Sequence, residues 1–315
     1  MKAHYWVGLC VLALACSESS SGDGGGGQGG FSGSSGSGGA GGAGGSGGSA
    51  GDASPGGQDS GTGGVLIVDG GPELEPWLLT IENLSNDEVH RLAKISLLEE
   101  SFGEKEEICA DVLLPPELPK SNIISSLTFN GGKLYASGKG EDEGDTLLLV
   151  NPCTCRATVV GRYGYTYVPG ITSTGAQDMF GITTTADLLL SIDPASGVAT
   201  ELAPLGSDYN TVGLSWAGSA RNTLLAINGA ADTIVEFDPT TGAQIGEPLP
   251  LDYDFGSVGA EYHPGFETLY ACSNPGDLLM VDTVTGKVTV GPSLNQPGCN
   301  NLAAPYGQVE CVSVR

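Results

Sequence analysis

The chain has 315 residues, with 37 acidic and 12 basic side chains and a formal net charge of −25. Such an excess of carboxylates repels phosphate groups, so the charge excludes nucleic acid as a partner and disfavours binding to anionic membrane surfaces. The excess negative charge can instead provide solubility or bind cations. The length suits one large domain or two small ones, but the first quarter is too poor in large apolar residues to contribute to a core.

The N-terminus has the pattern of an export signal. Lys2 precedes a mostly apolar run, residues 6–15, which is too short to span a bilayer as a stable helix. Residues 13–16 (Ala-Leu-Ala-Cys) resemble a bacterial lipobox, which implies cleavage before Cys16 and lipidation of that cysteine. The departure is Ala13, where lipoboxes most often have Leu, and ordinary signal-peptidase cleavage at the same bond is the alternative.

Three regions follow along the chain. Residues 1–15 are the expected signal peptide, and residues 16–73 are rich in Gly, Ser and Ala. That composition cannot bury enough apolar surface to fold, so we expect a lipidated Cys16 followed by a disordered tether with a reach of about 40 Å. Residues 74–315 form the predicted globular domain.

The globular sequence begins with a strand at residues 77–82, followed by a hairpin. Its two strands are expected at 90–98 and 108–114, around an acidic turn at 99–104. A helix over 86–101 is the alternative. The hairpin is preferred because Glu99 lies about two repeat lengths before Asp193.

A repeat organises the rest of the chain. Apolar pairs begin at 134, 179, 224 and 269, a constant interval of 45 residues. Later copies continue with a second apolar run and a turn of the type Asp-Pro-x-Ser/Thr-Gly, as at 193–197 and 238–242. Continuously apolar runs predict strands covered on both faces, which small sheets stacked around an axis provide. The sequence therefore predicts an all-β fold, a β-propeller of four-stranded blades.

This repeat, written Leu-Tyr followed by Leu-x-x-Ile/Val/Phe-Asp-Pro-x-Thr-Gly, resembles the blade repeat of secreted bacterial propellers of the YVTN/NHL-like type. The resemblance covers roughly residues 120 to 295 and implies a fold but no activity.

The blade pattern predicts the remaining strands. Inner strands are expected at 126–129, 169–172, 212–216 and 258–262, and outer strands at 156–160, 198–202, 243–245 and 287–290. Tail strands at 302–305 and 309–314 should join the N-terminal hairpin in a composite blade that closes the ring. About 240 residues at 45 per blade give five blades, with six as the alternative.

Besides Cys10 and Cys16 the chain has six cysteines, and an even number in an exported chain implies disulfides. We expect Cys272 to pair with Cys299 and Cys109 with Cys311. Cys153 and Cys155 would then pair with each other or with an unassigned partner. The alternative is that these two form a metal or redox pair, which lacks neighbouring ligands in the sequence.

Loops that join each outer strand to the next inner strand contain evenly spaced tyrosines, accompanied by acids and an amide. Aromatic rings beside carboxylates can hold a sugar, a peptide or a cation, whereas the alternative is that the rings pack between blades. The predicted ligand-binding residues are Tyr165, Tyr209, Tyr253, Asp208, Asn210, Asp252 and Asp254.

A second acidic feature lies at residues 140–145, where four carboxylates could bind Ca²⁺. The spacing matches no ordered calcium loop, so we interpret it as a solvated loop and assign no cofactor. His90 and His263 have no neighbouring nucleophile motif. No catalytic residue is assigned.

The sequence favours a lipid-anchored binding or scaffold module that recognises a protein or glycan, on the outer membrane or cell surface. A periplasmic or secreted location is the alternative. We expect a monomer that touches the membrane only through the lipid. The alternative function is a divalent-metal-dependent propeller hydrolase or lyase.

Overall fold

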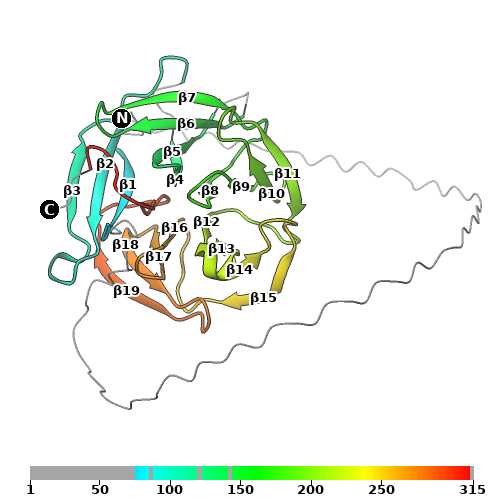
Figure 1. Ribbon diagram of the computed structural model, residues 1–315. Coiled ribbons are helices and arrows are strands. Elements are labelled where there is room, and N and C mark those ends of the chain that lie inside the picture. Colours follow the sequence, from blue (N-terminus) through cyan, green and yellow to red (C-terminus); the bar gives the residue numbers. More distant parts are fainter. Residues whose placement is uncertain (1–74, 85–87, 119–122, 141–143, 313–315) are drawn as a thin grey trace, which may run out of the picture. The chain divides into compact units, whose positions relative to one another are not determined.

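A computed structural model describes residues 75–84, 88–118, 123–140 and 144–312. The described residues form five blades of antiparallel strands around one axis (Figure 1). The prediction of a five-bladed propeller is therefore confirmed. Residues 1–74, which contain the predicted signal peptide, Cys16 and the tether, lie outside the described part.

Blade 1 contains β1 (Trp77–Leu84), β2 (Val89–Ser96) and β3 (Lys105–Cys109), and a single 3-10 turn (Glu99–Ser101) joins the last two. The predicted hairpin is confirmed, because β2 and β3 pair in antiparallel register, but its second strand spans 105–109 and not the expected 108–114.

Blades 2 to 5 each have four strands in sequence order. Blade 2 contains β4 (Ile124–Asn130), β5 (Lys133–Gly138), β6 (Thr146–Asn151) and β7 (Arg156–Arg162), and blade 3 contains β8 (Gly170–Ser173), β9 (Met179–Thr183), β10 (Leu188–Ile192) and β11 (Ala199–Pro204). Blade 4 contains β12 (Val212–Trp216), β13 (Leu224–Asn228), β14 (Thr233–Phe237) and β15 (Gln244–Pro250), and blade 5 contains β16 (Val258–His263), β17 (Thr268–Ser273), β18 (Asp277–Val281) and β19 (Val288–Ser293). A short helix, α1 (Gly218–Arg221), lies between β12 and β13.

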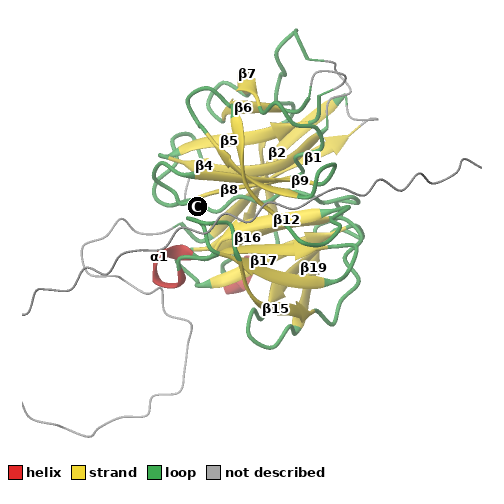
Figure 2. Ribbon diagram, turned by 90° about the vertical axis from the view of Figure 1, so that its right-hand side faces the viewer, coloured by secondary structure: helices red, strands yellow, loops and turns green. Residues whose placement is uncertain are grey.

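The ring has two faces, which we define by their loops. The upper face carries the loops from each outer strand to the next inner strand, together with the turns between second and third strands. The lower face carries the other turns, and α1 lies on that side with the C-terminal residues (Figure 2). Among the described residues no helix is long and apolar enough to cross a membrane.

Five apolar clusters hold the blades together, one in each interface between neighbours. The cluster between blades 2 and 3, for example, combines Tyr135 and Leu147 of one blade with Ile171 and Leu190 of the other. Each sheet is thus covered on both faces, which is why its second and third strands are continuously apolar.

Side chains also join the inner strands directly. Ile171 N donates to Ser126 Oγ (3.0 Å), Trp216 N to Thr172 Oγ1 (3.0 Å) and Tyr262 N to Ser215 Oγ (2.6 Å). The ring continues through the Glu261 carboxylate, which accepts a hydrogen bond from Ala304 N (3.4 Å). Neighbouring inner strands are therefore bonded to each other around the axis.

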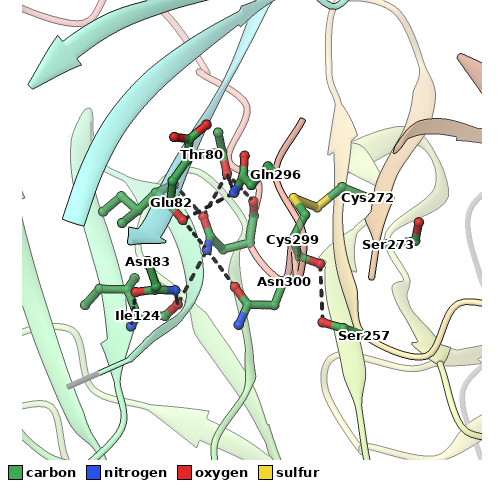
Figure 3. The surroundings of a disulfide bond; sticks show 12 residues. Thr80, Glu82, Asn83, Ile124, Ser257, Cys272, Ser273, Gln296, Cys299 and Asn300 are labelled. Atoms are coloured by element: carbon green, nitrogen blue, oxygen red, sulfur yellow. Dashed lines mark hydrogen bonds between the residues drawn. A yellow bond between two sulfur atoms is a disulfide. The ribbon is translucent and has the colours of Figure 1, made fainter. Parts of the chain in front are cut away.

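The C-terminal segment supplies the inner strand of blade 1. Leu79 and Ala303 exchange two backbone hydrogen bonds, of 2.8 and 2.9 Å. Beside them Asn301 accepts a hydrogen bond from Ile81 N (2.6 Å) and donates to Ile81 O (2.9 Å). Gln296 adds a bond to Thr80 (2.9 Å), as Figure 3 shows. The predicted composite blade is confirmed. Of the second strand expected at 309–314, the described residues 309–312 form no strand: residues 310–311 are a turn, and 313–315 lie outside the described residues.

The structure pairs all six cysteines of the domain. Cys272 bonds to Cys299, as expected. The expected pair of Cys109 with Cys311 is wrong, because Cys109 bonds to Cys155 and Cys153 bonds to Cys311. The turn that holds Cys153 and Cys155 lies against β3 and the C-terminal segment at once, so each cysteine finds a different partner. Every disulfide joins blade 1 or the C-terminal segment to a neighbouring blade.

Candidate functional site: the upper face

Three aspartates fix the loops of the upper face. Each stands just before the third strand of its blade and accepts a hydrogen bond from the loop that leads to the next blade. The bonds are Val168 N to Asp145 (2.7 Å), Tyr209 N to Asp187 (2.9 Å) and Phe255 N to Asp232 (3.0 Å). The loops are therefore held to the sheets, and their exposed side chains stand on a fixed base.

These hydrogen bonds define which loop residues are equivalent. Val168, Tyr209 and Phe255 occupy the same place, and all three are buried, with at most 1 % of their surface exposed. Tyr209 is thus a core residue, and burial raises its pKa to about 12. Its even spacing from Tyr165 and Tyr253 is a coincidence of loop length. A buried ring cannot contact a ligand at the surface.

The other two predicted tyrosines are half-buried. Tyr253 packs edge-on against Phe255, with ring centroids 5.0 Å apart, and its hydroxyl lies 2.9 Å from Ser273 Oγ. Tyr165 packs against the cluster between blades 2 and 3. Each ring is tied to the core on one side and open to solvent on the other.

The predicted polar residues are all exposed on the upper face: Asp208, Asn210, Asp252 and Asp254. One of them has an evident structural role, because Asp252 accepts a hydrogen bond from Val288 N (2.6 Å). Asp208 directly precedes Tyr209, and Asp254 directly precedes Phe255. These two carboxylates therefore occupy corresponding positions in the loops that lead to blades 4 and 5.

Tyr167 is an exposed aromatic residue that the sequence analysis missed. Its side chain is 53 % exposed and its backbone lies in the left-handed region (φ 52°). Lys139 Nζ lies 4.5 Å from the ring centroid, a cation–π contact with blade 2. No sequence signal marks this residue, because neither its φ angle nor its exposure follows from spacing.

The acidic loop at 140–145 contains one structural carboxylate. Asp145 is buried and also accepts a hydrogen bond from Gly140 N (3.2 Å), and desolvation raises its pKa. Its oxygens are occupied by backbone donors and are not free for Ca²⁺. Residues 141–143 lie outside the described part, so the remaining acids of this loop stay a prediction.

Glu261 and His263 are also buried, and both have structural partners. Glu261, on the inner strand β16, accepts a hydrogen bond from Ser215 Oγ (3.3 Å), and desolvation raises its pKa well above the usual value. His263 Nε2 lies 2.8 Å from Glu75 O, and burial lowers its pKa to about 4, so the imidazole is neutral. His263 thereby fastens the start of blade 1 to blade 5.

A metal centre would need several ligands close together. Among the described residues one group of three brings its ligand atoms within 4.8 Å of one another: Cys153, Glu310 and Cys311. Both cysteines are bonded in a disulfide and cannot act as thiolate ligands in that state. Glu261 lies on an inner strand and belongs to no such group of three ligands within the described part of the chain.

A shallow cavity of about 390 Å³ lies on the lower face of blade 5. Its lining includes Tyr262, Glu267 and Thr283. Arg221 of α1 donates to Thr283 Oγ1 (2.6 Å) and pairs with Glu236. This cavity is the second surface feature that the sequence did not reveal.

No family model and no curated protein matches the chain. Among solved structures, a chain from the "Crystal structure of Nidogen/Laminin Complex" is similar with a TM-score of 0.50 and 10 % identity, over 74 % of this chain and 99 % of that one. In all, 1056 solved chains match, so the fold alone selects no activity. At this identity the likeness supports the propeller fold, and the YVTN/NHL-like repeat type stays a prediction.

Proposed function

We propose that this propeller is a binding module that recognises a protein partner through its upper face. The observation that carries the proposal is the pinned loop: exposed carboxylates and aromatic rings project from loops that the three aspartates fix to the sheets. Such a surface loses little conformational entropy on binding. A partner chain with a basic surface fits the net charge of −25 and the exposed Asp208 and Asp254.

The similar chain comes from a complex of two proteins, a use of the fold that fits a protein partner. We further propose that the module is a cell-envelope lipoprotein anchored through Cys16. Metabolic labelling with a radioactive fatty acid tests the anchor in the full chain. Label that persists in a Cys16→Ser variant would overturn it.

Site-specific photo-crosslinking in the producing cells tests the binding face. A photoreactive phenylalanine analogue replaces Tyr167 or Asn210 on the upper face, or Val198 or Ile245, which are exposed beside or within the outer strands. We expect one discrete protein adduct from the upper-face positions and none from the control positions. A polydisperse glycan adduct, or equal adducts from both sets, contradicts the proposal.

Charge variants sharpen the test. Asp208→Asn with Asp254→Asn should lower the adduct yield roughly tenfold, since two charge contacts of about 0.7 kcal/mol each are lost. Glu201→Gln with Glu247→Gln removes the same charge from exposed outer strands and should leave the yield unchanged. An adduct formed from position 267, beside the lower cavity, but not from 167 or 210 would move the site to the lower face and overturn the upper-face assignment.

A further inference from the structure

The three disulfides differ in their accessibility. Cys272 and Cys299 have no exposed surface, and Cys109 is 2 % exposed beside its half-buried partner Cys155. Cys153 and Cys311 are both exposed. Thiol–disulfide exchange requires a thiolate to reach a sulfur atom, so an exposed disulfide reacts before buried ones.

The exposed disulfide holds a segment that has few other backbone contacts. After Ala304 the chain crosses the lower face as residues 305–312. Among the described residues this segment makes one backbone–backbone hydrogen bond, from Val312 N to Val309 O (3.3 Å), and it lies within the segment itself. No strand pairing fixes it to a blade.

Besides the disulfide, three side chains fix the segment to the ring: Tyr306, Val309 and Val312. The Tyr306 hydroxyl donates to Ser173 O (3.2 Å), and its ring lies 6.2 Å from the Trp216 ring between centroids. Val312 is buried in the cluster between blades 1 and 2. Tyr306 therefore covers part of the lower face beside the inner strands β8 and β12.

Cys311 also has a left-handed backbone, with φ 64°. L-residues rarely adopt this conformation without a constraint, and the cross-link to Cys153 supplies one. Opening the disulfide would let the backbone relax. Closure of the ring does not depend on this bond. The ring is closed by residues before position 305: the Leu79–Ala303 pairing, the Asn301 hydrogen bonds and the buried Cys272–Cys299 disulfide.

We propose that Cys153–Cys311 is a thiol–disulfide exchange site at which a dithiol reductant releases residues 305–312 and uncovers the surface beneath Tyr306. A thiolate of the dithiol attacks one sulfur and forms a mixed disulfide, while the other cysteine leaves as a thiolate and takes a proton. The second thiol of the reductant then displaces the protein sulfur, which is protonated in turn. The dithiol becomes a disulfide, and two electrons and two protons pass to the protein.

The neighbouring carboxylate affects which thiols react. A ligand oxygen of Glu310 lies within 4.8 Å of both sulfur atoms. Its negative charge disfavours an anionic monothiol and opposes the thiolate that leaves. An uncharged dithiol is therefore the reductant class that fits the site.

Timed reduction of the folded protein with dithiothreitol tests the site. Samples are quenched with an alkylating reagent and mapped by peptide mass spectrometry, and far-UV circular dichroism verifies that the sheets stay intact. We expect Cys153 and Cys311 to be alkylated roughly tenfold or more faster than the other four cysteines, because exposure controls access. In the same samples limited proteolysis should remove the segment after Ala304, and Trp216 fluorescence should change.

Two variants serve as controls. Cys153→Ser with Cys311→Ser should reproduce the protease sensitivity without reductant, and Glu310→Gln should be reduced faster than the wild type. Earlier or simultaneous reduction of Cys109–Cys155 or Cys272–Cys299 would overturn the proposal. So would a segment that stays equally protected from protease after its disulfide is reduced.

Discussion

One turn in blade 2 differs from the corresponding turns of the other four blades. In every blade the turn between third and fourth strands touches the outer strand of the preceding blade. In four blades the residue at this contact is a glycine in the left-handed region, and a Cβ there would lie 2.0 to 2.8 Å from an atom of the neighbouring blade. These residues are Gly103, Gly197, Gly242 and Gly286. In blade 2 the same position holds Cys155 (φ 52°), which bonds to Cys109 on β3.

The closest approach between two neighbouring blades is thus made in two ways. Four turns omit the side chain, so that the backbone of the turn packs directly against the outer strand of the preceding blade. The turn of blade 2 keeps its side chain, and that side chain forms a covalent bond to the neighbouring outer strand. A non-glycine residue in this conformation is strained by roughly 1 kcal/mol, and the cross-link offsets that strain.

Breaking the covalent contact should have the largest effect. Cys109→Ala with Cys155→Ala removes a cross-link between residues 46 positions apart, which should lower the free energy of unfolding by about 4 kcal/mol. Equilibrium unfolding in urea measures the loss. Replacing Cys155 by glycine instead of alanine, with Cys109→Ala in both, should recover about 1 kcal/mol because glycine adopts the left-handed region freely. Equal stability of the two variants would show that the turn of blade 2 does not favour glycine as the corresponding turns of the other blades do.

A side chain added to a glycine turn should have the next largest effect. The Cβ of Gly242→Ala would lie 2.5 Å from Ala203 Cβ on β11, and φ is 71°. We expect a loss of about 2 kcal/mol, part from backbone strain and part from the clash. Gly132→Ala is the matched control, because φ is 74° and no atom lies within 4 Å of the added Cβ.

The control should lose about 1 kcal/mol, from backbone strain alone. Urea unfolding of both variants separates the two contributions. If Gly132→Ala is as damaging as Gly242→Ala, close packing between the blades contributes nothing at this turn.

The same comparison explains what could be predicted from the sequence. The blades follow from local information: a 45-residue period, two apolar runs and a turn residue in each copy. The pairing of Cys109 with Cys155 does not follow from local information, because it depends on which outer strand each turn contacts once the ring is closed. Cys109 lies 46 residues before Cys155, and nothing in the repeat marks it as the partner.

The candidate site shows more clearly where prediction from the sequence fails. Regular spacing suggested that Tyr165, Tyr209 and Tyr253 share one environment, whereas the aspartate hydrogen bonds make Tyr209 equivalent to Val168 and Phe255. Loops of different length shift equivalent positions by two or three residues, which is enough to exchange a core residue for a surface residue. Spacing predicted strands well because strand pairing fixes their register, and loops have no such constraint.

The residue that opens each turn gives the smallest expected effect. Asp238 Oδ1 accepts hydrogen bonds from Thr240 N (2.9 Å) and Thr241 N (2.8 Å). In blade 2 Asn151 Oδ1 accepts the same two bonds, from Cys153 N (2.9 Å) and Thr154 N (3.0 Å). The two turns therefore have the same geometry, and only one of them carries a charge.

The charge makes the aspartate turns sensitive to acid. The backbone hydrogen bond from Thr241 lowers the pKa of Asp238, so as the pH falls the unfolded chain takes up its proton first. The stabilisation is present above the unfolded-state pKa of about 3.9 and is lost as the pH falls through the lower folded-state value. Asp238→Asn should melt at nearly the wild-type temperature at pH 7 and lose less stability than the wild type in acid. Thermal melts at both pH values measure this difference, and an equal loss in acid would mean that the amide and the carboxylate hold the turn alike, with no contribution from charge.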